Sequence, residues 1–226
     1  GLAYNTITVE NGSNQSLWGR IAGVFNDRET VITPDPNPMP QPESDRLDVL
    51  LLGIRGENDS AIEEEGGLLT DTIIIVSIDK ITKKTALVSV PRDLYIEMDA
   101  QAANNKKIKL KGKINEVYER GLANGGGIAL AKQIFSRITG IYIDQAIVAD
   151  FNAFREVVTN LGGIDIRLAK PFNEKTQWGY EFSLPAGDNH LDGDQALYYV
   201  RSRYSTSDFD RARRQQEVIS IIKNKA

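Results

Sequence analysis

Cysteine is absent from this chain of 226 residues, and histidine occurs once, at His190. The absence of cysteine excludes disulfides, thiolate metal ligands and a cysteine nucleophile. His190 lies in the turn-like segment GDNHLDG, and a lone loop histidine is typical of a surface residue rather than of a triad base. Zinc sites use several cysteine or histidine ligands, so no zinc is expected either.

Long apolar runs and the common nucleotide-binding pattern are also missing. No stretch of 18 apolar residues and no signal peptide is present, so we expect the chain as given to be soluble, with a membrane anchor preceding it. The glycines of NGGGIALAK, near Gly125, lack the spacing of GxxxxGK followed by Ser or Thr. A nucleotide is therefore not the expected substrate, and no nucleic-acid partner is indicated.

The distribution of proline marks one boundary. In TPDPNPMPQPES, residues 33–44, five of the eight prolines occupy every second position, which predicts a semi-rigid spacer. Upstream, the apolar residues of segment 17–25 follow helical spacing. They indicate a helix at a membrane interface or, more simply, a segment that packs on the domain or is loosely ordered. Length and a hydrophobic content of 41% predict one domain over residues 45–226, preceded by a segment and spacer over residues 1–44.

From residue 45 onward, apolar runs of strand length alternate with segments of helical periodicity. Short continuous apolar runs predict buried strands, and one predicted helix is capped by Asp150 and closed by Gly162 and Gly163. The predicted strands are residues 47–54, 71–78, 85–90, 145–149 and 163–168, and the predicted helices are residues 127–139 and 151–161. This order predicts an α/β fold, an αβα sandwich in which helices flank a central mixed sheet.

Polar residues occupy the predicted strand ends, where ligands of α/β sheets tend to bind. Asp71 opens the second strand, and Arg92 and Asp93 close the third in SVPRD, where Pro91 ends the strand pairing. Each residue alone is also consistent with ordinary loop chemistry, such as a cap or a surface ion pair. Together, a carboxylate suited to Mg²⁺ and an arginine suited to phosphate oxygens are typical of phosphoryl transfer.

The segment YVRSRYSTSDFDRARRQQ, residues 199–216, contains five arginines in a chain whose net charge is −4. Ser207 is placed to cap a helix, with Asp210 three residues later. On that helix, Arg211 and Gln215 continue an apolar stripe, so we expect both to face a cleft. Several converging guanidinium groups suit a phosphate ester. The alternative is a solvated helix end whose arginines pair with neighbouring carboxylates.

Eight motifs in fixed order give the chain a resemblance to a known family. Between residues 50 and 216 they are LLLGI, LTDTIIIVSID, LVSVPRDLYI, KIN, VADFNAFREVV, LGGIDI, LDGDQALYYVRSR and DFDRARRQQ. The most specific part is SVPRD followed by the pair YVRSR and DFDRxxRQQ. In these motifs the chain resembles the LytR-CpsA-Psr family of cell-wall glycopolymer phosphotransferases.

The resemblance implies an extracytoplasmic, membrane-anchored transferase. Such an enzyme takes a glycopolymer, for example teichoic acid or capsule, from a polyprenyl-pyrophosphate carrier and joins it to peptidoglycan as a phosphodiester. The resemblance also implies assistance by Mg²⁺ and an apolar tunnel for the lipid. Because relatives are expected to continue beyond Ala226, the domain is expected to be cut short at its C-terminus.

The same resemblance implies roles for individual residues. Asp71 matches the metal-binding aspartate of the family. Positions that contact pyrophosphate in the family match Arg92, Lys113, Arg201, Arg203, Arg211 and Gln215. Asp208 matches an acidic residue that either orients Arg211 or accepts the acceptor's proton, and Asp93 is the second candidate for this base. Catalysis is therefore expected to involve Arg92, Asp93, Arg201, Arg203 and Asp208.

The chain departs from the family pattern at one position. Where many relatives carry an aspartate in LLLGxD that also faces the metal, this chain has Arg55. Glu57, Asp59 or the acidic run 63–65 could compensate, although such a run is usually a solvated patch. A cation in this place is expected to weaken Mg²⁺ binding, and it could itself contact the pyrophosphate.

Two other functions use the same residues. One is a pyrophosphatase-like hydrolase with water as the acceptor. The other is a non-catalytic receptor or regulator that binds an anionic lipid or wall polymer. The sequence does not separate transfer from hydrolysis.

Overall fold

The structure is a computed structural model that describes residues 38–56, 68–103, 105–175, 177–203 and 207–225, all within the unit Asn37–Ala226. Segment 17–25 and the first part of the proline-rich spacer lie outside the described residues, so the predicted boundary at residue 44 stays a prediction. Among the described residues, no helix combines the length and hydropathy that a membrane span requires.

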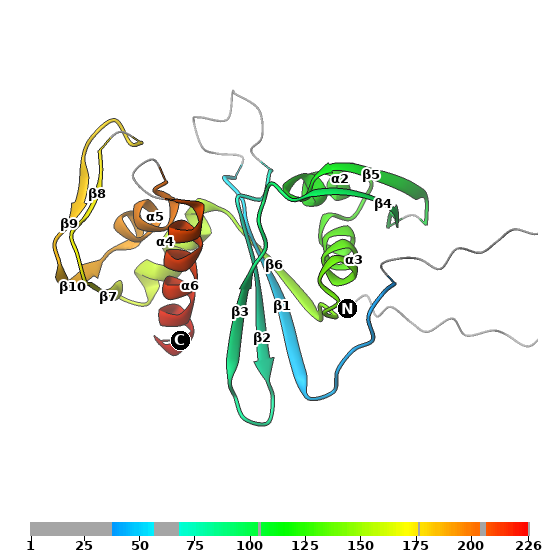
Figure 1. Cartoon of the computed structure of the whole chain (residues 1–226), viewed down its shortest axis with the longest axis horizontal. Helices are drawn as coiled ribbons and strands as arrows, with labels where there is room; N and C mark the ends of the chain where they lie inside the picture. Colours follow the sequence, from blue (N-terminus) through cyan, green and yellow to red (C-terminus); the bar gives the residue numbers. More distant parts are fainter. Residues whose placement is uncertain (1–37, 57–67, 104, 176, 204–206, 226) are drawn as a thin grey trace, which may run out of the picture. The chain divides into compact units, whose positions relative to one another are not determined.

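A four-stranded mixed sheet forms the centre of the fold (Figure 1). Its strands are β1 (Arg46–Gly53), β2 (Thr72–Asp79), β3 (Thr85–Ser89) and β6 (Gln145–Ala149). They lie in the order β3-β2-β1-β6, with β6 parallel to β1 and the other pairs antiparallel. The predicted strands agree with these bounds to within one residue, and the predicted mixed sheet is confirmed.

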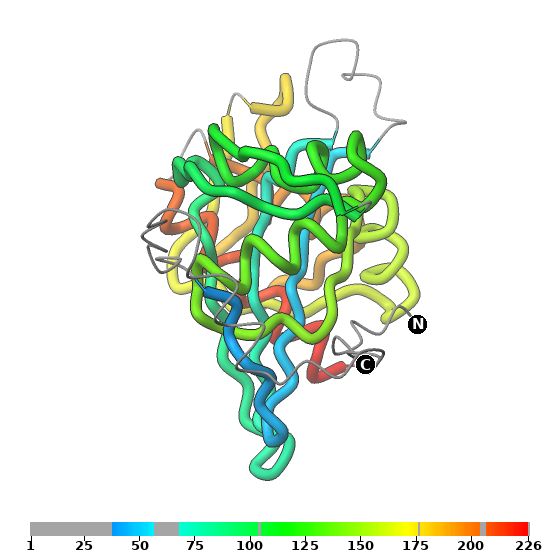
Figure 2. Tube along the Cα trace, turned by 90° about the vertical axis from the view of Figure 1, so that its right-hand side faces the viewer, coloured from blue at the N-terminus to red at the C-terminus, as the bar shows by residue number. Residues whose placement is uncertain are grey.

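One face of the sheet carries the larger apolar core. It is covered by α2 (Val117–Ala123), α3 (Gly127–Thr139), the short η1 (Ile114–Glu116) and the hairpin of β4 (Tyr95–Gln101) and β5 (Lys107–Lys113). Leu50 and Leu52 of β1 pack here with Ile134 and Phe135 of α3, and all four are almost fully buried. Figure 2 views the molecule from this side, with the helices and hairpin in front of the sheet.

The second face is covered by three helices, and two small two-stranded sheets pack on the far side of these helices (Figure 1). The helices are α4 (Phe151–Asn160), α5 (Gly193–Arg201) and α6 (Asp208–Lys225). The small sheets pair β7 (Ile164–Leu168) with β10 (Gly187–Leu191) and β8 (Phe172–Glu174) with β9 (Phe182–Leu184). These elements have a separate core of their own. Helices on both faces confirm the αβα sandwich.

The strand predicted over residues 163–168 forms, but it does not belong to the central sheet. Gly162 and Gly163 both have positive φ angles, 72° and 84°, so the chain turns sharply after α4. The strand β7 then pairs with β10 in a separate two-stranded sheet. His190 of β10 is mostly exposed and contacts Asp165 at 2.7 Å, as expected of a surface histidine.

Polar side chains connect α6 to the edge of the sheet. Gln216 donates to the Ser89 hydroxyl at 2.8 Å, and Lys223 donates to the Thr85 hydroxyl at 2.9 Å. These contacts place α6 alongside β3, with Gln216 at the end of the strand and Lys223 at its start.

Candidate active site

Three loops meet at one end of the sheet. The Asp71 amide donates to the Gly53 carbonyl at 2.9 Å, which ties the start of β2 to the end of β1. Buried Asn115 accepts from the Thr70 amide at 3.0 Å through its backbone carbonyl, and its own amide donates to the Arg92 carbonyl at 3.3 Å. The backbone therefore fixes the positions of Asp71 and Arg92 relative to each other.

A chain of alternating charges connects these loops. An Arg92 Nη1 donates to Asp71 Oδ1 at 2.6 Å, and Arg92 Nε lies 3.5 Å from Asp93 Oδ2. Lys113 Nζ donates to Asp93 Oδ1 at 2.6 Å. On the other side, Arg55 Nε lies 3.7 Å from Asp71 Oδ2. Each oxygen of Asp71 therefore faces a guanidinium group.

The environment of these groups fixes their charges. Burial by itself would lower the pKa of Arg92, but Asp71, Asp93 and Asp208 together raise it above its ordinary value. The hydrogen bond from Lys113, opposed by slight burial and supported by Arg92, lowers the pKa of Asp93. Arg92 is thus a fixed cation, and Asp93 is a weaker base than an ordinary aspartate.

The start of α6 supplies the opposite wall of the site. Ser207 and Asp210 cap the helix reciprocally: the Asp210 amide donates to the Ser207 hydroxyl and the Ser207 amide donates to the Asp210 carboxylate, both at 3.2 Å. The predicted cap is confirmed. One turn on, the Gln215 side chain donates to the Thr72 hydroxyl of β2 at 2.9 Å.

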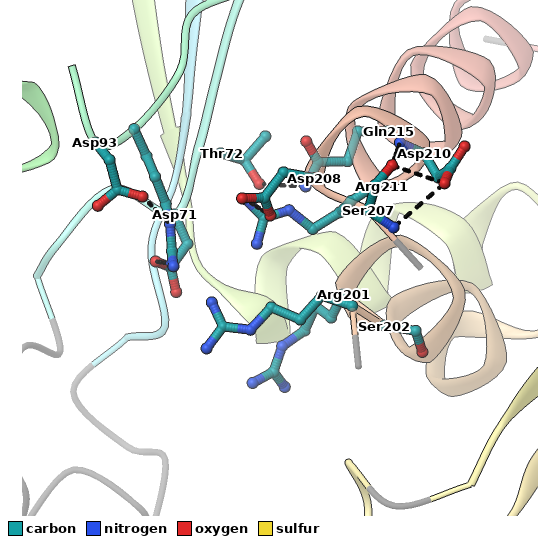
Figure 3. A network of polar contacts seen from close by, with 12 residues as sticks. Asp71, Thr72, Asp93, Arg201, Ser202, Ser207, Asp208, Asp210, Arg211 and Gln215 are labelled. Atoms are coloured by element: carbon teal, nitrogen blue, oxygen red, sulfur yellow. Dashed lines mark hydrogen bonds and ion pairs between the residues drawn. The ribbon is translucent and has the colours of Figure 1, made fainter. Parts of the chain in front are cut away.

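Arg211 faces the same space as Gln215. Its side chain is only 12% exposed and lies 3.4 Å from Asp208. Burial is the main cause that lowers the pKa of Arg211; Asp208 opposes this effect, and the nearby charges of Arg92 and Arg203 add to it. The expected orientation of Arg211 and Gln215 into a cleft is confirmed. Figure 3 shows Asp71 and Asp93 on one side and Arg201, Asp208 and Arg211 on the other.

Aromatic rings hold Arg201 in place at the end of α5. Its guanidinium carbon lies 3.8 Å from the centroid of the Phe151 ring and 4.8 Å from the Trp178 ring. The Gln177 side chain donates to the Arg201 carbonyl at 3.1 Å and accepts from the Arg203 amide at 2.7 Å. Such contacts preorganise a cation without neutralising it. The sequence analysis did not identify Phe151, Trp178 or Gln177, because their motifs carry no charge signal.

Arg214 is a second residue that the sequence analysis did not assign. It is 6% exposed, and its Nε donates to the Tyr199 carbonyl at 2.8 Å. It also donates to the Ser202 carbonyl. Arg214 thus connects α6 to the backbone on both sides of Arg201, and we assign it a positioning role.

An apolar cavity of about 150 Å³ adjoins this cation cluster. It lies between β1 and β6 of the sheet and helices α4 to α6, with Leu51, Ile147, Phe154, Val200 and Ile219 among its lining residues. Arg201, Gln215 and Thr72 also line it, so the cavity and the polar site are continuous. A dry cavity of this size can hold an apolar group as large as benzene.

The described residues contain no preformed group of three or more Asp, Glu, His or Cys side chains that could hold Mg²⁺. Asp71, the expected ligand, has a guanidinium group at each carboxylate oxygen. Glu57, Asp59 and the acidic run 63–65 lie outside the described residues. The expectation of Mg²⁺ stays a prediction.

All the residues assigned from the sequence lie around one site. The loops at the sheet end contribute Asp71, Arg92, Asp93 and Lys113, and helices α5 and α6 with their connection contribute Arg201, Arg203, Asp208, Arg211 and Gln215. The site combines clustered guanidinium groups with an adjacent apolar cavity. This arrangement is typical of proteins that bind an amphipathic phosphate ester.

Comparison with known proteins places the chain in a family. The LytR_cpsA_psr family matches residues 24–226, so the chain belongs to this family. TagU of Oceanobacillus iheyensis, named a polyisoprenyl-teichoic acid–peptidoglycan teichoic acid transferase, is 28% identical over 237 residues, covering 100% of this chain and 68% of its own length. The regulatory protein MsrR of Staphylococcus aureus is 30% identical over 182 residues, covering 79% of this chain. The chain spans only 48% of MsrR.

Solved structures show the same fold. The crystal structure of Bacillus subtilis TagV has a TM-score of 0.61 at 27% identity, covering 81% of this chain and 66% of TagV. A structure of TagT bound to LI-WTA has a TM-score of 0.60 at 25% identity, covering 84% of this chain and 68% of TagT.

Proposed function

We propose that this protein is a phosphotransferase that moves a glycopolymer from a polyprenyl-pyrophosphate carrier to peptidoglycan. One observation carries the proposal: Arg201 lies in the same group of side chains as Asp208 and Arg211 (Figure 3) and also lines the apolar cavity. A lipid pyrophosphate has the matching construction, with a dianionic head joined directly to an apolar tail. The names of relatives such as TagU, and family membership, support the same assignment.

The cation cluster would act by positioning and charge neutralisation. A hydroxyl oxygen of the muramic acid residue forms a new bond to the phosphorus on the sugar side of the pyrophosphate. The bond from this phosphorus to the bridging oxygen breaks, and polyprenyl phosphate leaves with the electron pair. Negative charge grows on the leaving oxygen, where Arg201, Arg203 and Arg211 stabilise it. Arg92 and Lys113 hold the phosphate groups in line for attack.

Asp208 is the candidate for the base that accepts the hydroxyl proton. Its side chain is 67% exposed at the mouth of the site, where an acceptor from solvent can reach it. Asp93 is less suitable, because Lys113 and Arg92 lower its pKa. The apolar cavity takes the first part of the lipid tail, which fixes the pyrophosphate at the arginines. The protein would work at the extracytoplasmic face of the membrane, where both substrates meet.

The second candidate is a receptor or regulator that binds the lipid without turning it over. The name of MsrR, a regulatory protein, favours it. Incubation of the purified protein with a polyprenyl-pyrophosphate donor and peptidoglycan separates the two, with lipid products followed by mass spectrometry. A transferase releases polyprenyl phosphate, and Arg201→Ala suppresses the release. A receptor retains intact donor, which would overturn the proposal.

A further inference from the structure

Four lysines form a regular row on the solvent face of the β4–β5 hairpin. In KIKLKGK, the lysines of β5 alternate with Ile108, Leu110 and Gly112. Ile108 and Leu110 belong to the apolar core beneath the hairpin. Side chains of a strand alternate between faces, so the lysines all point outward. The row consists of Lys107, Lys109, Lys111 and Lys113, and all four are exposed.

The row has a net positive charge after its partners are counted. On the neighbouring strand β4, the outward positions opposite the lysines are Tyr95, Glu97, Asp99 and Gln101. Glu97 contacts Lys109 at 3.0 Å and Lys111 at 3.5 Å. With Asp93, the partner of Lys113, included, four cations face three carboxylates on this surface. In a chain whose net charge is −4, this is a local reversal of sign.

One end of the row is part of the candidate active site. Lys113 donates to Asp93, Asp93 contacts Arg92, and Arg92 donates to Asp71. From Lys113 the row runs away from the site for six residues, about 20 Å in a strand. The hairpin covers one face of the sheet, whereas the apolar cavity lies at the other face (Figure 1).

The positions of the cavity and the lysine row predict how the donor is oriented in the site. If the pyrophosphate binds at the arginines with its lipid tail in the cavity, its sugar end points away from the tail. The lysine row lies on that side. We propose that the outward face of the β4–β5 hairpin binds the phosphodiester backbone of the donor's glycopolymer. This inference rests on the proposed function and specifies its substrate as a polyanion rather than a neutral glycan.

The spacing of the lysines favours a polyol phosphate chain with three-carbon units. Consecutive lysines are two residues apart, which is six backbone bonds and about 7 Å. Consecutive phosphorus atoms joined through a three-carbon polyol are also six bonds apart, so their spacing in an extended chain is about the same. A row of cations can then meet a row of phosphates at matching intervals.

Lysines on an exposed strand also protect against aggregation, so the row needs a direct test. A labelled glycerol phosphate oligomer is titrated into the whole protein at low salt, followed by fluorescence anisotropy. The test variant carries Lys107→Gln, Lys109→Gln and Lys111→Gln and retains Lys113. The matched control removes three exposed lysines of the β2–β3 turn through Lys80→Gln, Lys83→Asn and Lys84→Gln. Asn suits position 83, where φ is 61°.

The test variant is expected to bind the oligomer about tenfold more weakly, the product of three exposed ion pairs. The control is expected to bind like the wild type, and the difference should shrink as salt rises. Equal binding by wild type and test variant, or equal weakening by the control, would overturn the proposal. Tighter binding of an RNA oligomer than of the polyol phosphate would also overturn it. With a short donor that lacks the polymer, turnover by the test variant stays normal; turnover absent in every variant would instead refute the proposed function.

Discussion

Arg55 and Arg92 approach the carboxylate of Asp71 from its two sides, with Arg55 Nε 3.7 Å from Oδ2 and Arg92 Nη1 2.6 Å from Oδ1. The family resemblance implies an aspartate facing a metal ion at position 55, where this chain has arginine. A second guanidinium group at this carboxylate supplies positive charge where the ion would supply it. The arrangement therefore bears directly on whether this protein needs Mg²⁺.

The first prediction concerns the metal. We expect Arg55→Asp to bind Mg²⁺ more tightly than the wild type, because it replaces a repelling cation with a carboxylate ligand. Calorimetric titration of Mg²⁺ measures binding, and a Mg²⁺ series of lipid-pyrophosphate turnover should show a lower half-saturating concentration in the variant. In Asp71→Ala the metal-dependent part of the turnover should vanish. An unchanged titration in Arg55→Asp, with full activity in Asp71→Ala, would show that these residues do not form the family's metal site.

The second prediction concerns Arg201 and Arg203. Each Arg→Ala substitution is expected to lower kcat about 10²- to 10³-fold, the scale for removing one preorganised donor from a charged transition state. Arg167→Ala serves as the control, since Arg167 is 79% exposed on β7, outside the cation cluster. Melting temperatures should be similar in all three variants. Near-normal turnover in a folded Arg201→Ala, Arg203→Ala double variant would remove both residues from the site.

The third prediction separates two roles of Asp208. If it is the base, Asp208→Asn lowers kcat about 10²- to 10⁴-fold and removes the acidic limb of the pH–rate profile. A residue that only orients Arg211 would leave the limb in place and raise KM. Asp93→Asn is the comparison, and its effect on the limb should be small because Asp93 is already a weak base. A profile unchanged in Asp208→Asn and altered in Asp93→Asn would reverse the assignment.

The fourth prediction tests the positioning role of Arg214. Replacing it with Met leaves the carbonyls of Tyr199 and Ser202 without this donor and should lower the free energy of unfolding by about 3 kcal/mol. Arg213→Met, one residue away on the exposed side of α6, should change it by less than about 0.5 kcal/mol. Chemical denaturation measures both. Equal stability of the two variants would show that Arg214 does not hold the backbone around Arg201.

The fifth prediction concerns the apolar cavity. Ile219 lines it, and Ile219→Trp should fill part of its volume and weaken binding of a lipid pyrophosphate while leaving binding of inorganic pyrophosphate, which has no apolar tail, unaffected. Ile81→Trp is the control, because Ile81 is 78% exposed on the β2–β3 turn. If Ile219→Trp weakens binding of both ligands equally, the tail does not enter this cavity.

Much of the fold follows from local patterns. The strands of the sheet are apolar runs, and α3 has a single apolar stripe that ends at Gly140, whose φ is 71°. The β4–β5 hairpin is missing from the predicted elements, although KIKLKGK alternates with the period of a strand. The sequence does not show that β7 pairs with β10, because strand pairing depends on distant residues and leaves no local signal.

The charged residues of the candidate site could be predicted from the sequence. Burying an arginine or a carboxylate costs free energy unless the group is paired. Arg211 on an apolar stripe therefore predicted that an anionic partner lies nearby. The residues that hold these charged groups in place have no comparable signal in the sequence. Phe151 also fits an ordinary core position, and the burial of Arg214 depends on how α6 packs against α5. The apolar cavity could not be separated from the core, because both use the same residue types.

The most direct test of transfer is a single-turnover experiment in ¹⁸O-labelled water. The protein receives a donor labelled in its glycopolymer together with peptidoglycan, and mass spectrometry follows the phosphate products. The account predicts polyprenyl phosphate in solution, the labelled polymer attached to peptidoglycan through a phosphodiester, and no ¹⁸O in either. Polymer phosphate free in solution and carrying ¹⁸O would contradict it, because water rather than the muramic hydroxyl would then be the acceptor.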